Sequence, residues 1–248
     1  MSKLAKKRLD VLLVERGLVE SRARGQALVM AGKVFSGERR LDKPGMSLVE
    51  DTVLDVRGQD HPWVSRGGLK LEHGLKFFGL DPSGRTAIDV GASTGGFSDV
   101  LLQGGANKIY AVDVGRGQLA WKLRQDERIV VLEKTNARYL THDLIPDEID
   151  MVVCDASFIG LRTVLPAALN LAKAGAHLIA LIKPQFEVGK GRVGKGGVVR
   201  DPDLHEEVCR EIRTWLDERT DWTVLGTTES PIKGPEGNIE FLIGATKV

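Results

Sequence analysis

Cysteine, aromatic side chains and long apolar runs are all scarce in this chain of 248 residues. The two cysteines, Cys154 and Cys209, lack the paired spacing of a disulfide scaffold or a cysteine-rich zinc site, and they favour a reducing compartment. No apolar run approaches the ~18 residues of a membrane-spanning helix, and the first residues contain no apolar signal core. We therefore expect a cytoplasmic protein without a membrane segment.

A large net charge is also lacking, because the chain contains 35 basic and 34 acidic residues. This balance excludes a histone-like polycation and a disordered acidic tail. It conceals an asymmetry, since residues 1–43 contain eleven basic and five acidic side chains, a local charge of +6 that leaves −5 for the rest. Unless the excess is a chance feature of helix surfaces, a basic module precedes a mildly acidic one, which indicates two domains with different tasks.

The basic module predicts two helices followed by short strands. Leu9 and Leu12 share one helical face, and Gly17 ends that helix. Ser21 is the predicted N-cap of a second helix over 22–31.

Three stretches of this module resemble the S4 RNA-binding domain: RLDVLL at 8–13, SRARGQA at 21–27 and GKV at 32–34. The resemblance implies a small α+β domain over residues 1–60 that binds structured RNA. Because this module offers almost no aromatic surface for stacking bases, we expect it to recognise RNA shape and backbone. The predicted RNA contacts of this module are Arg8, Arg22, Arg24 and Lys33.

Residues 65–248, after a linker at 61–64, alternate seven β-rich runs with helical stretches, one of which covers 160–174. This alternation predicts an α/β fold with a doubly wound, Rossmann-like sheet. The last two predicted strands, 222–227 and 239–245, are joined by a segment too short for a helical crossover. We therefore expect the last strand to run antiparallel.

The first strand of this domain runs directly into a glycine-rich turn, DVGASTGGF at 89–97. Such a turn before a helix is typical of a nucleotide-cofactor site, because glycine lets the backbone approach a ligand and the helix start offers free N–H groups. The spacing differs from the Gly-x-Gly-x-x-Gly of dinucleotide enzymes and favours S-adenosylmethionine. Asp113, at the end of the second strand, could hold its ribose, and Asp89 could attract its ammonium. A plain turn is the alternative.

Six motifs carry a wider resemblance. They are WVSRGGLKL at 63–71, the turn at 89–97, VDVGRGQL at 112–119, CDASFI at 154–159, LIKPQFE at 181–187 and GNIEF at 237–241. Together they resemble the S4-domain methyltransferases known as the hemolysin A or TlyA family, whose catalytic domain is similar to the FtsJ/RrmJ ribose 2′-O-methyltransferases. The resemblance implies S-adenosylmethionine as methyl donor, cytidine ribose in ribosomal RNA as target, and ribosomal subunits as partners.

The resemblance also implies a catalytic tetrad of Lys70, Asp155, Lys183 and Glu240. Asp155 and Lys183 each follow an apolar predicted strand, and parallel strands direct their carboxyl ends to one crevice. Lys70 lies on the first predicted helix of the domain, and Glu240 lies within its last predicted strand. Lys183 is the hypothetical base for the ribose hydroxyl. A nearby lysine and sulfonium favour its neutral form, whereas the two carboxylates oppose it, so the role stays open.

The remaining predicted contacts lie on two loops and the cofactor turn. Asn136, after the third strand, is predicted to face adenine, with a plain turn residue as the alternative. The predicted cofactor contacts are Ser65, Asp89, Gly91, Ser93, Gly95, Gly96, Phe97, Asp113, Asn136 and Asp155. A basic, glycine-rich loop at 187–201 is predicted to form a mobile lid over RNA, the alternative being a flexible connection, and its predicted RNA contacts are Lys190, Arg192 and Lys195. The histidines show no ligand spacing, so no metal is expected.

Other functions remain as alternatives. A non-catalytic RNA- or ribosome-binding assembly factor could use the same surfaces, but it would not need all four polar residues of the tetrad. A membrane-lytic hemolysin, as one family name suggests, would need an amphipathic or apolar membrane segment, and the sequence contains none. A DNA or protein methyltransferase is a further alternative. An amine-methylating enzyme would carry an Asn/Asp-Pro-Pro-aromatic run, whereas this chain has DASF at 155–158.

Overall fold

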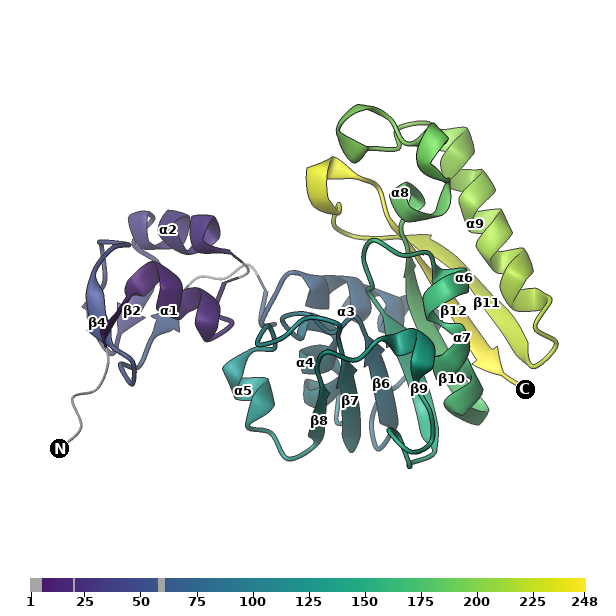
Figure 1. Ribbon diagram of the computed structural model, residues 1–248, viewed down its shortest axis with the longest axis horizontal. Helices are drawn as coiled ribbons and strands as arrows, with labels where there is room; N and C mark the ends of the chain where they lie inside the picture. The colour runs from purple at the N-terminus through teal and green to yellow at the C-terminus, as the bar shows by residue number, and fades with distance from the viewer. Residues whose placement is uncertain (1–5, 20, 58–60) are drawn as a thin grey trace.

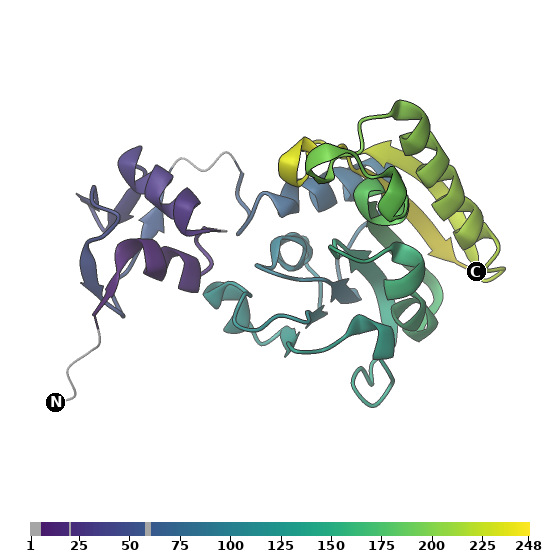
Figure 2. The ribbon, with the colours of Figure 1, turned by 45° about the horizontal axis from the view of Figure 1, so that its top comes forward.

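The structure of the protein, a computed structural model, describes residues 6–19, 21–57 and 61–248. A small amino-terminal module lies beside a larger α/β domain (Figure 1). A second view agrees that helix α1 (Leu9–Glu15) of the module faces helix α5 (Trp121–Arg124) of the large domain (Figure 2). The predicted end of the first domain, residue 60, lies outside the described residues.

The small module combines two helices with two small antiparallel sheets. Its elements are β1 (Lys6–Arg8), α1, α2 (Arg22–Met30), β2 (Val34–Ser36), β3 (Arg39–Arg40), β4 (Ser47–Val49) and β5 (Asp55–Val56). β1 pairs with β4, and β2 lies between β3 and β5. Gly17 follows α1 with a φ of 63°, and the Ser21 side chain caps α2 by accepting a hydrogen bond from the backbone N–H of Arg24, both in positions that the sequence predicts.

The large domain is built on a seven-stranded sheet in which all seven predicted strands are found. Its elements are α3 (Gly67–Phe78), β6 (Thr86–Val90), α4 (Gly96–Gln103), β7 (Lys108–Val112), α5, β8 (Ile129–Leu132), η1 (Ala137–Tyr139), β9 (Ile149–Cys154), α6 (Leu161–Val164), α7 (Pro166–Leu171), β10 (Ala172–Ile182), α8 (Pro184–Glu187), η2 (Lys190–Arg192), η3 (Lys195–Gly197), α9 (Pro202–Asp217), β11 (Trp222–Glu229), η4 (Pro235–Gly237) and β12 (Phe241–Lys247).

The sheet has the strand order β11-β12-β10-β9-β6-β7-β8. β12 is antiparallel to both of its neighbours, β10 and β11, and the other neighbouring pairs are parallel. The chain starts at central β6, proceeds outward to β8 and then crosses to β9, so a switch point lies between β6 and β9. The carboxyl ends of the parallel strands meet at one edge of the sheet. Because β12 runs the opposite way, its start at Phe241, opposite Ile182, reaches the same edge.

Helices cover both faces of the sheet. Ala87 packs with side chains of α3, α4 and α5, whereas its neighbour Ile88 packs with those of α6, α7 and α9. The sequence predicts one helix over 160–174, but Pro166 begins a new helix and β10 already starts at Ala172. Proline fits the first turn of a helix but not its interior, which explains the division. Within the described residues, no helix combines the length and apolarity that crossing a membrane requires.

Candidate active site

Four charged side chains meet at the edge of the sheet where β9 and β10 end. Lys70 comes from α3, Asp155 follows β9, Lys183 follows β10, and Glu240 precedes β12. Lys70 Nζ lies 2.7 Å from Glu240 Oε2 and 3.5 Å from Asp155 Oδ2. Lys183 Nζ lies 2.6 Å from Asp155 Oδ1. The structure therefore brings the predicted tetrad together as a row of alternating charge.

Glu240 differs in one respect from its predicted place within the last strand. β12 begins one residue later, at Phe241, and the Glu240 carbonyl accepts a hydrogen bond from the backbone N–H of Ser230 at 2.9 Å. The next residue pairs with Ile182, which directly precedes Lys183. Glu240 reaches the site because an antiparallel strand starts where its parallel neighbour ends.

The tetrad is shielded from water, and each of its charges is paired. Lys70, Lys183 and Glu240 are 6%, 5% and 1% exposed, and Asp155 is half-buried. Burial of an unpaired charge is costly, so the alternation of ammonium groups and carboxylates is what permits this burial. Two amines are thereby held at fixed positions inside the domain.

Lys183 has one further partner that the tetrad does not include. Its aligned hydrogen bonds go to the backbone carbonyl of Asp155 at 3.0 Å and to the Ser157 hydroxyl at 2.8 Å. Asp155 Oδ1, although close, accepts no aligned hydrogen bond. Ser157 is absent from the predicted site residues, and its only signal in the sequence is its place two residues after Asp155.

Two adjoining cavities, of about 480 and 270 Å³, lie at this edge of the sheet. Four residues line both of them, namely Gly91, Ser93, Asp155 and Ser157. The smaller cavity also contains Lys70 and Lys183, whereas the larger one extends past the ends of β7 and β8. An elongated ligand can therefore occupy both cavities with one end beside the two lysines.

Nine of the ten predicted cofactor residues line these cavities. Asp113 and Asn136 line the larger cavity; Ser65, Asp89, Gly96 and Phe97 line the smaller one; Gly91, Ser93 and Asp155 line both. Gly95 lines neither, because a Cβ at this position would lie 2.2 Å from Leu123 Cδ1, on the side of the apolar core. With a φ of 93°, Gly95 turns the chain into α4 instead.

The turns after β6 and β9 approach each other closely. Gly91 has a φ of 81°, and a Cβ there would lie 2.8 Å from Ala156 Cα. A side chain would push apart the two turns that carry Asp89 and Asp155. Glycine is therefore required at this position for both backbone conformation and space.

Asp89 is fully buried below the glycine turn, and hydrogen bonds reach only one of its two carboxylate oxygens within the described residues. Its Oδ2 accepts hydrogen bonds from the Ser98 backbone N–H at 3.0 Å and the Ser98 hydroxyl at 2.7 Å, while Oδ1 has no partner among the described residues. Burial raises the pKa of Asp89 to about 7, against the opposing effect of the Ser98 hydrogen bonds. A buried carboxylate oxygen without a partner fits a ligand cation.

Asp113 and Asn136 are both held by backbone groups at the larger cavity. The Asp113 carboxylate accepts hydrogen bonds from the N–H groups of Ser93 at 2.8 Å and Gly115 at 2.7 Å. Asn136 Oδ1 accepts one from the N–H of Arg138 at 3.1 Å and thereby caps η1. Asn136 is thus a turn residue that also lines the cavity.

Phe158 stands at the mouth of the larger cavity. It is 89% exposed, although it is a large apolar residue, and it has a φ of 65°. Its ring centroid lies 5.2 Å from that of Phe186 on α8. An exposed aromatic ring on an unusual backbone conformation beside a cavity indicates a surface for a planar ligand.

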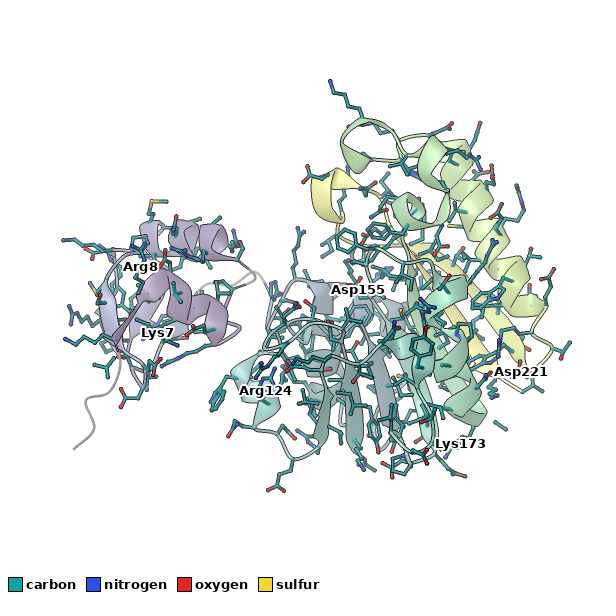
Figure 3. All side chains as sticks on the ribbon, viewed as in Figure 1. Lys7, Arg8, Arg124, Asp155, Lys173 and Asp221 are labelled. Atoms are coloured by element: carbon teal, nitrogen blue, oxygen red, sulfur yellow. The ribbon has the colours of Figure 1, made fainter. Side chains whose placement is uncertain are left out.

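Two of the four predicted RNA contacts of the small module, Arg8 and Arg22, bind one carboxylate. Arg8 donates two hydrogen bonds to the fully buried Asp10, and Arg22 donates another. The hydrogen bonds from Arg8, with those from Gln26 and Arg22, hold the pKa of Asp10 well below its usual range despite burial. On the same module, Arg24 is exposed and Lys33 is half-buried; Figure 3 shows Arg8 there and Asp155 on the large domain.

The predicted RNA contacts of the large domain lie on the loop after α8. Arg192 donates to both carboxylate oxygens of Glu207, at 2.5 and 2.6 Å, and Lys195 is exposed. The side chain of Lys190 lies outside the described part of the structure. Val199 is buried and donates its backbone N–H to the Asn238 side chain at 3.1 Å. The end of this loop is therefore anchored, and Arg192 can contact RNA only with the N–H donors that it does not direct at Glu207.

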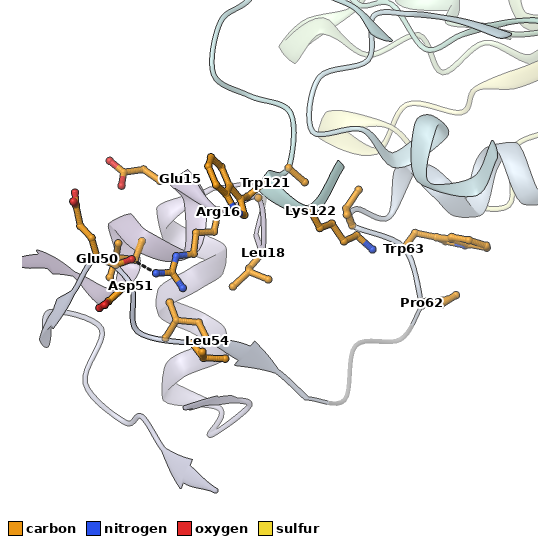
Figure 4. Close-up of a pocket in the computed structure, with 15 residues that line it drawn as sticks. Glu15, Arg16, Leu18, Glu50, Asp51, Leu54, Pro62, Trp63, Trp121 and Lys122 are labelled. Carbon is orange, nitrogen blue, oxygen red and sulfur yellow. Dashed lines mark hydrogen bonds between the residues drawn. The ribbon is translucent and has the colours of Figure 1, made fainter. Parts of the chain in front are cut away.

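A larger cavity, of about 750 Å³, lies between the module and the large domain (Figure 4). Leu18 and Leu54 line it from the module, and Trp63 and Trp121 line it from the other side. Arg16 donates to backbone carbonyls of the segment between β4 and β5 at its rim. No tetrad residue lines this cavity, so its volume does not mark the chemical centre.

Comparisons with known proteins agree with this geometry. Residues 63–247 match the FtsJ-like methyltransferase family, and residues 7–54 match the S4 domain. The Bacillus subtilis protein YqxC, which carries a provisional rRNA methyltransferase name, is 50% identical over 96% of this chain and 85% of its own. TlyA of Mycobacterium tuberculosis, named a 16S/23S rRNA (cytidine-2′-O)-methyltransferase, is 47% identical over 95% of this chain and 88% of its own.

A solved structure from Streptococcus thermophilus, provisionally described as a hemolysin, has a TM-score of 0.75 and 43% sequence identity to this chain, with coverage of 99% of this chain and 90% of its own. The predicted methyltransferase sheet, preceded by an S4 domain, is confirmed. The chain belongs to the FtsJ-like methyltransferases, in the S4-domain group that includes TlyA.

Proposed function

We propose that this protein transfers a methyl group from S-adenosylmethionine to the ribose 2′-hydroxyl of cytidine in ribosomal RNA. The observation that carries the proposal is the buried row of Lys70, Asp155, Lys183 and Glu240 beside two joined cavities. Such a row can orient a hydroxyl and receive its proton. The family match and the printed name of the M. tuberculosis relative support the reaction and the substrate.

The residues around the two cavities fit S-adenosylmethionine, which when bound supplies a methyl group activated by a sulfonium. Asp113, fixed by two backbone N–H groups, can accept hydrogen bonds from the ribose diol. The unpartnered Oδ1 of Asp89 fits the ammonium, directly or through water. Asn136 lines the far end of the larger cavity and can meet the adenine. The methyl group would then lie toward the lysines.

The side chains of the tetrad have two roles at the acceptor hydroxyl, orientation and proton removal. Lys70 and Glu240, paired at 2.7 Å, orient the oxygen, and Lys183 takes its proton at Nζ. Lys183 must be neutral for this step. The Asp155 carbonyl and the Ser157 hydroxyl accept hydrogen bonds from Lys183 Nζ and hold the amine in place for this step.

RNA binding is assigned to both parts of the chain. Arg8, Arg22 and Arg24 on the small module supply positive charge for phosphates, and Lys195 supplies it beside the catalytic domain. Phe158 offers an exposed ring at the mouth of the cavity, against which the target base can stack. The two contact regions together suit a folded RNA better than a short single strand.

Transfer of a tritiated methyl group to ribosomal subunits that lack the modification tests the proposal. We expect label in RNA at a cytidine, within alkali-resistant linkages, because a 2′-O-methyl group blocks alkaline cleavage. Lys70→Ala is the inactive control, and Thr163→Ala, an exposed change on α6, is the active one. Label on a base or on protein would reject the ribose assignment.

A further inference from the structure

Ser157 lies where the turn after β9 meets the end of β10. Its hydroxyl accepts a hydrogen bond from Lys183 Nζ at 2.8 Å, and the residue lines both cavities. Ser157 is exposed, whereas Lys183, which also lines the smaller cavity, is buried. The Ser157 hydroxyl therefore lies beside the amine, at the wall of the space in which the methyl donor and the ribose would meet.

Lys183 needs an external group to fix the direction of its amine. A lysine side chain has four flexible carbons and an ammonium whose three donors can rotate. The two aligned acceptors are the Asp155 carbonyl and the Ser157 hydroxyl, while Asp155 Oδ1 attracts the charge without an aligned hydrogen bond. Ser157 thus contributes the only aligned side-chain acceptor that the described residues offer to this amine.

The turn that carries Ser157 is clamped to the segment that follows Lys183. The ring of Phe158 contacts that of Phe186 at 5.2 Å between centroids. Three residues further, the backbone N–H of Leu161 donates to Glu187 Oε1 at 2.7 Å. These contacts with α8, which begins directly after Lys183, hold the turn in position relative to the lysine. The Ser157 hydroxyl is therefore kept within hydrogen-bond distance of the amine.

We infer that Ser157 is a positioning residue of the methyl-transfer reaction, which directs the Lys183 amine toward the ribose 2′-oxygen. The inference rests on the proposed function. Because the Ser157 oxygen accepts from Lys183, its own proton points to another acceptor, and the hydroxyl does not compete for the substrate proton.

Single-turnover methyl transfer by Ser157→Ala tests the inference. We expect the maximal rate to fall about tenfold, as for loss of a hydrogen bond to a charged group, with cofactor and RNA affinities within about twofold. Ser157→Thr keeps the hydroxyl and should restore the rate, and the exposed Thr163→Ala should match the original protein.

The outcomes separate this inference from the proposed function. An unmodified protein that transfers no methyl group to ribosomal RNA would overturn the function itself. An active protein whose Ser157→Ala variant keeps the maximal rate would overturn only the role of Ser157. The same holds if Ser157→Thr fails to restore a lost rate while its melting temperature and ligand affinities are normal.

Discussion

In the small module, the buried carboxylate of Asp10 is surrounded by two arginines, whereas in the catalytic domain two carboxylates alternate with two lysines. The side chains of Arg8 and Arg22 are 50% and 57% exposed, but those of Lys70 and Lys183 are almost fully buried. One cluster therefore turns its positive charge toward solvent and the other encloses it.

The choice of cation matches this difference. Guanidinium groups stay charged and keep spare N–H donors for phosphates while they bind a carboxylate with two others. Lysine amines can lose a proton when their surroundings favour the neutral form, which arginine does not do. The arginine cluster is thus suited to binding a polyanion, and the lysine row is suited to proton transfer.

The largest expected effect comes from removing the amine at the enclosed cluster. Lys183→Ala should lower the single-turnover methyl-transfer rate about 10²–10⁴-fold, the range typical of loss of a general base. Cofactor and RNA affinities should change little, because other residues supply those contacts. Retention of the normal rate and pH dependence would show that Lys183 is not the base.

Removing one carboxylate from each cluster compares their energetics directly. Glu240→Ala leaves the buried Lys70 with only the more distant Asp155, and it should lower the free energy of unfolding by about 3 kcal/mol. Asp10→Ala frees arginines that can reach water, and it should cost only about 1–2 kcal/mol. Urea unfolding of both variants measures the difference; equal costs would contradict the comparison.

The pH dependence of cofactor binding isolates a third carboxylate, Asp89, which has no cation beside it among the described residues. With its pKa raised to about 7, the carboxyl should ionise as the pH rises from 6 to 8, and affinity for S-adenosylmethionine should increase about tenfold. The raised pKa of Asp89 should also make the free energy of unfolding fall as the pH rises from 3.8 to about 7, because the folded state binds the proton more tightly than the unfolded state does.

Calorimetric titration of S-adenosylmethionine at several pH values checks this expectation. Asp89→Asn keeps an oxygen for Ser98 but cannot ionise, so its affinity should be low and independent of pH. A pH dependence that survives in Asp89→Asn would assign it to another group.

The smallest effect is expected at a solvent-exposed cation of the module. Arg24→Ala should weaken RNA binding a few-fold, and it should reduce the slope of log affinity against log salt by about 0.7–0.9 if one phosphate contact is lost. The exposed Arg213→Ala on α9 is the matched control. Filter binding across a salt series measures both slopes; identical slopes would remove Arg24 from the RNA surface.

The doubly wound sheet and its antiparallel last strand could be predicted from the alternation of apolar and helical stretches, and the tetrad from the motifs that carry the resemblance. Cys154 and Ile182 end apolar strands, and Asp155 and Lys183 follow them at the common edge. The alignment of Ser157 with Lys183 could not be predicted, because it depends on how one turn packs against another. The same holds for Gly95. Its place in the glycine turn predicts a ligand contact, but a Cβ at this position would meet Leu123 in the core.

The antiparallel pairing of β12 with β10 sets the position of Glu240 by backbone geometry. A shift of this pairing by one residue would turn the apolar side chains of β12, such as Leu242 and Ile243, to the wrong faces. A shift by two residues would keep the faces but move Glu240 by about 7 Å along the strand and break its contact with Lys70. Accurate alignment of the last strand during folding is thus a precondition for an active protein, and a misaligned molecule could look native by its helix and strand content while lacking activity.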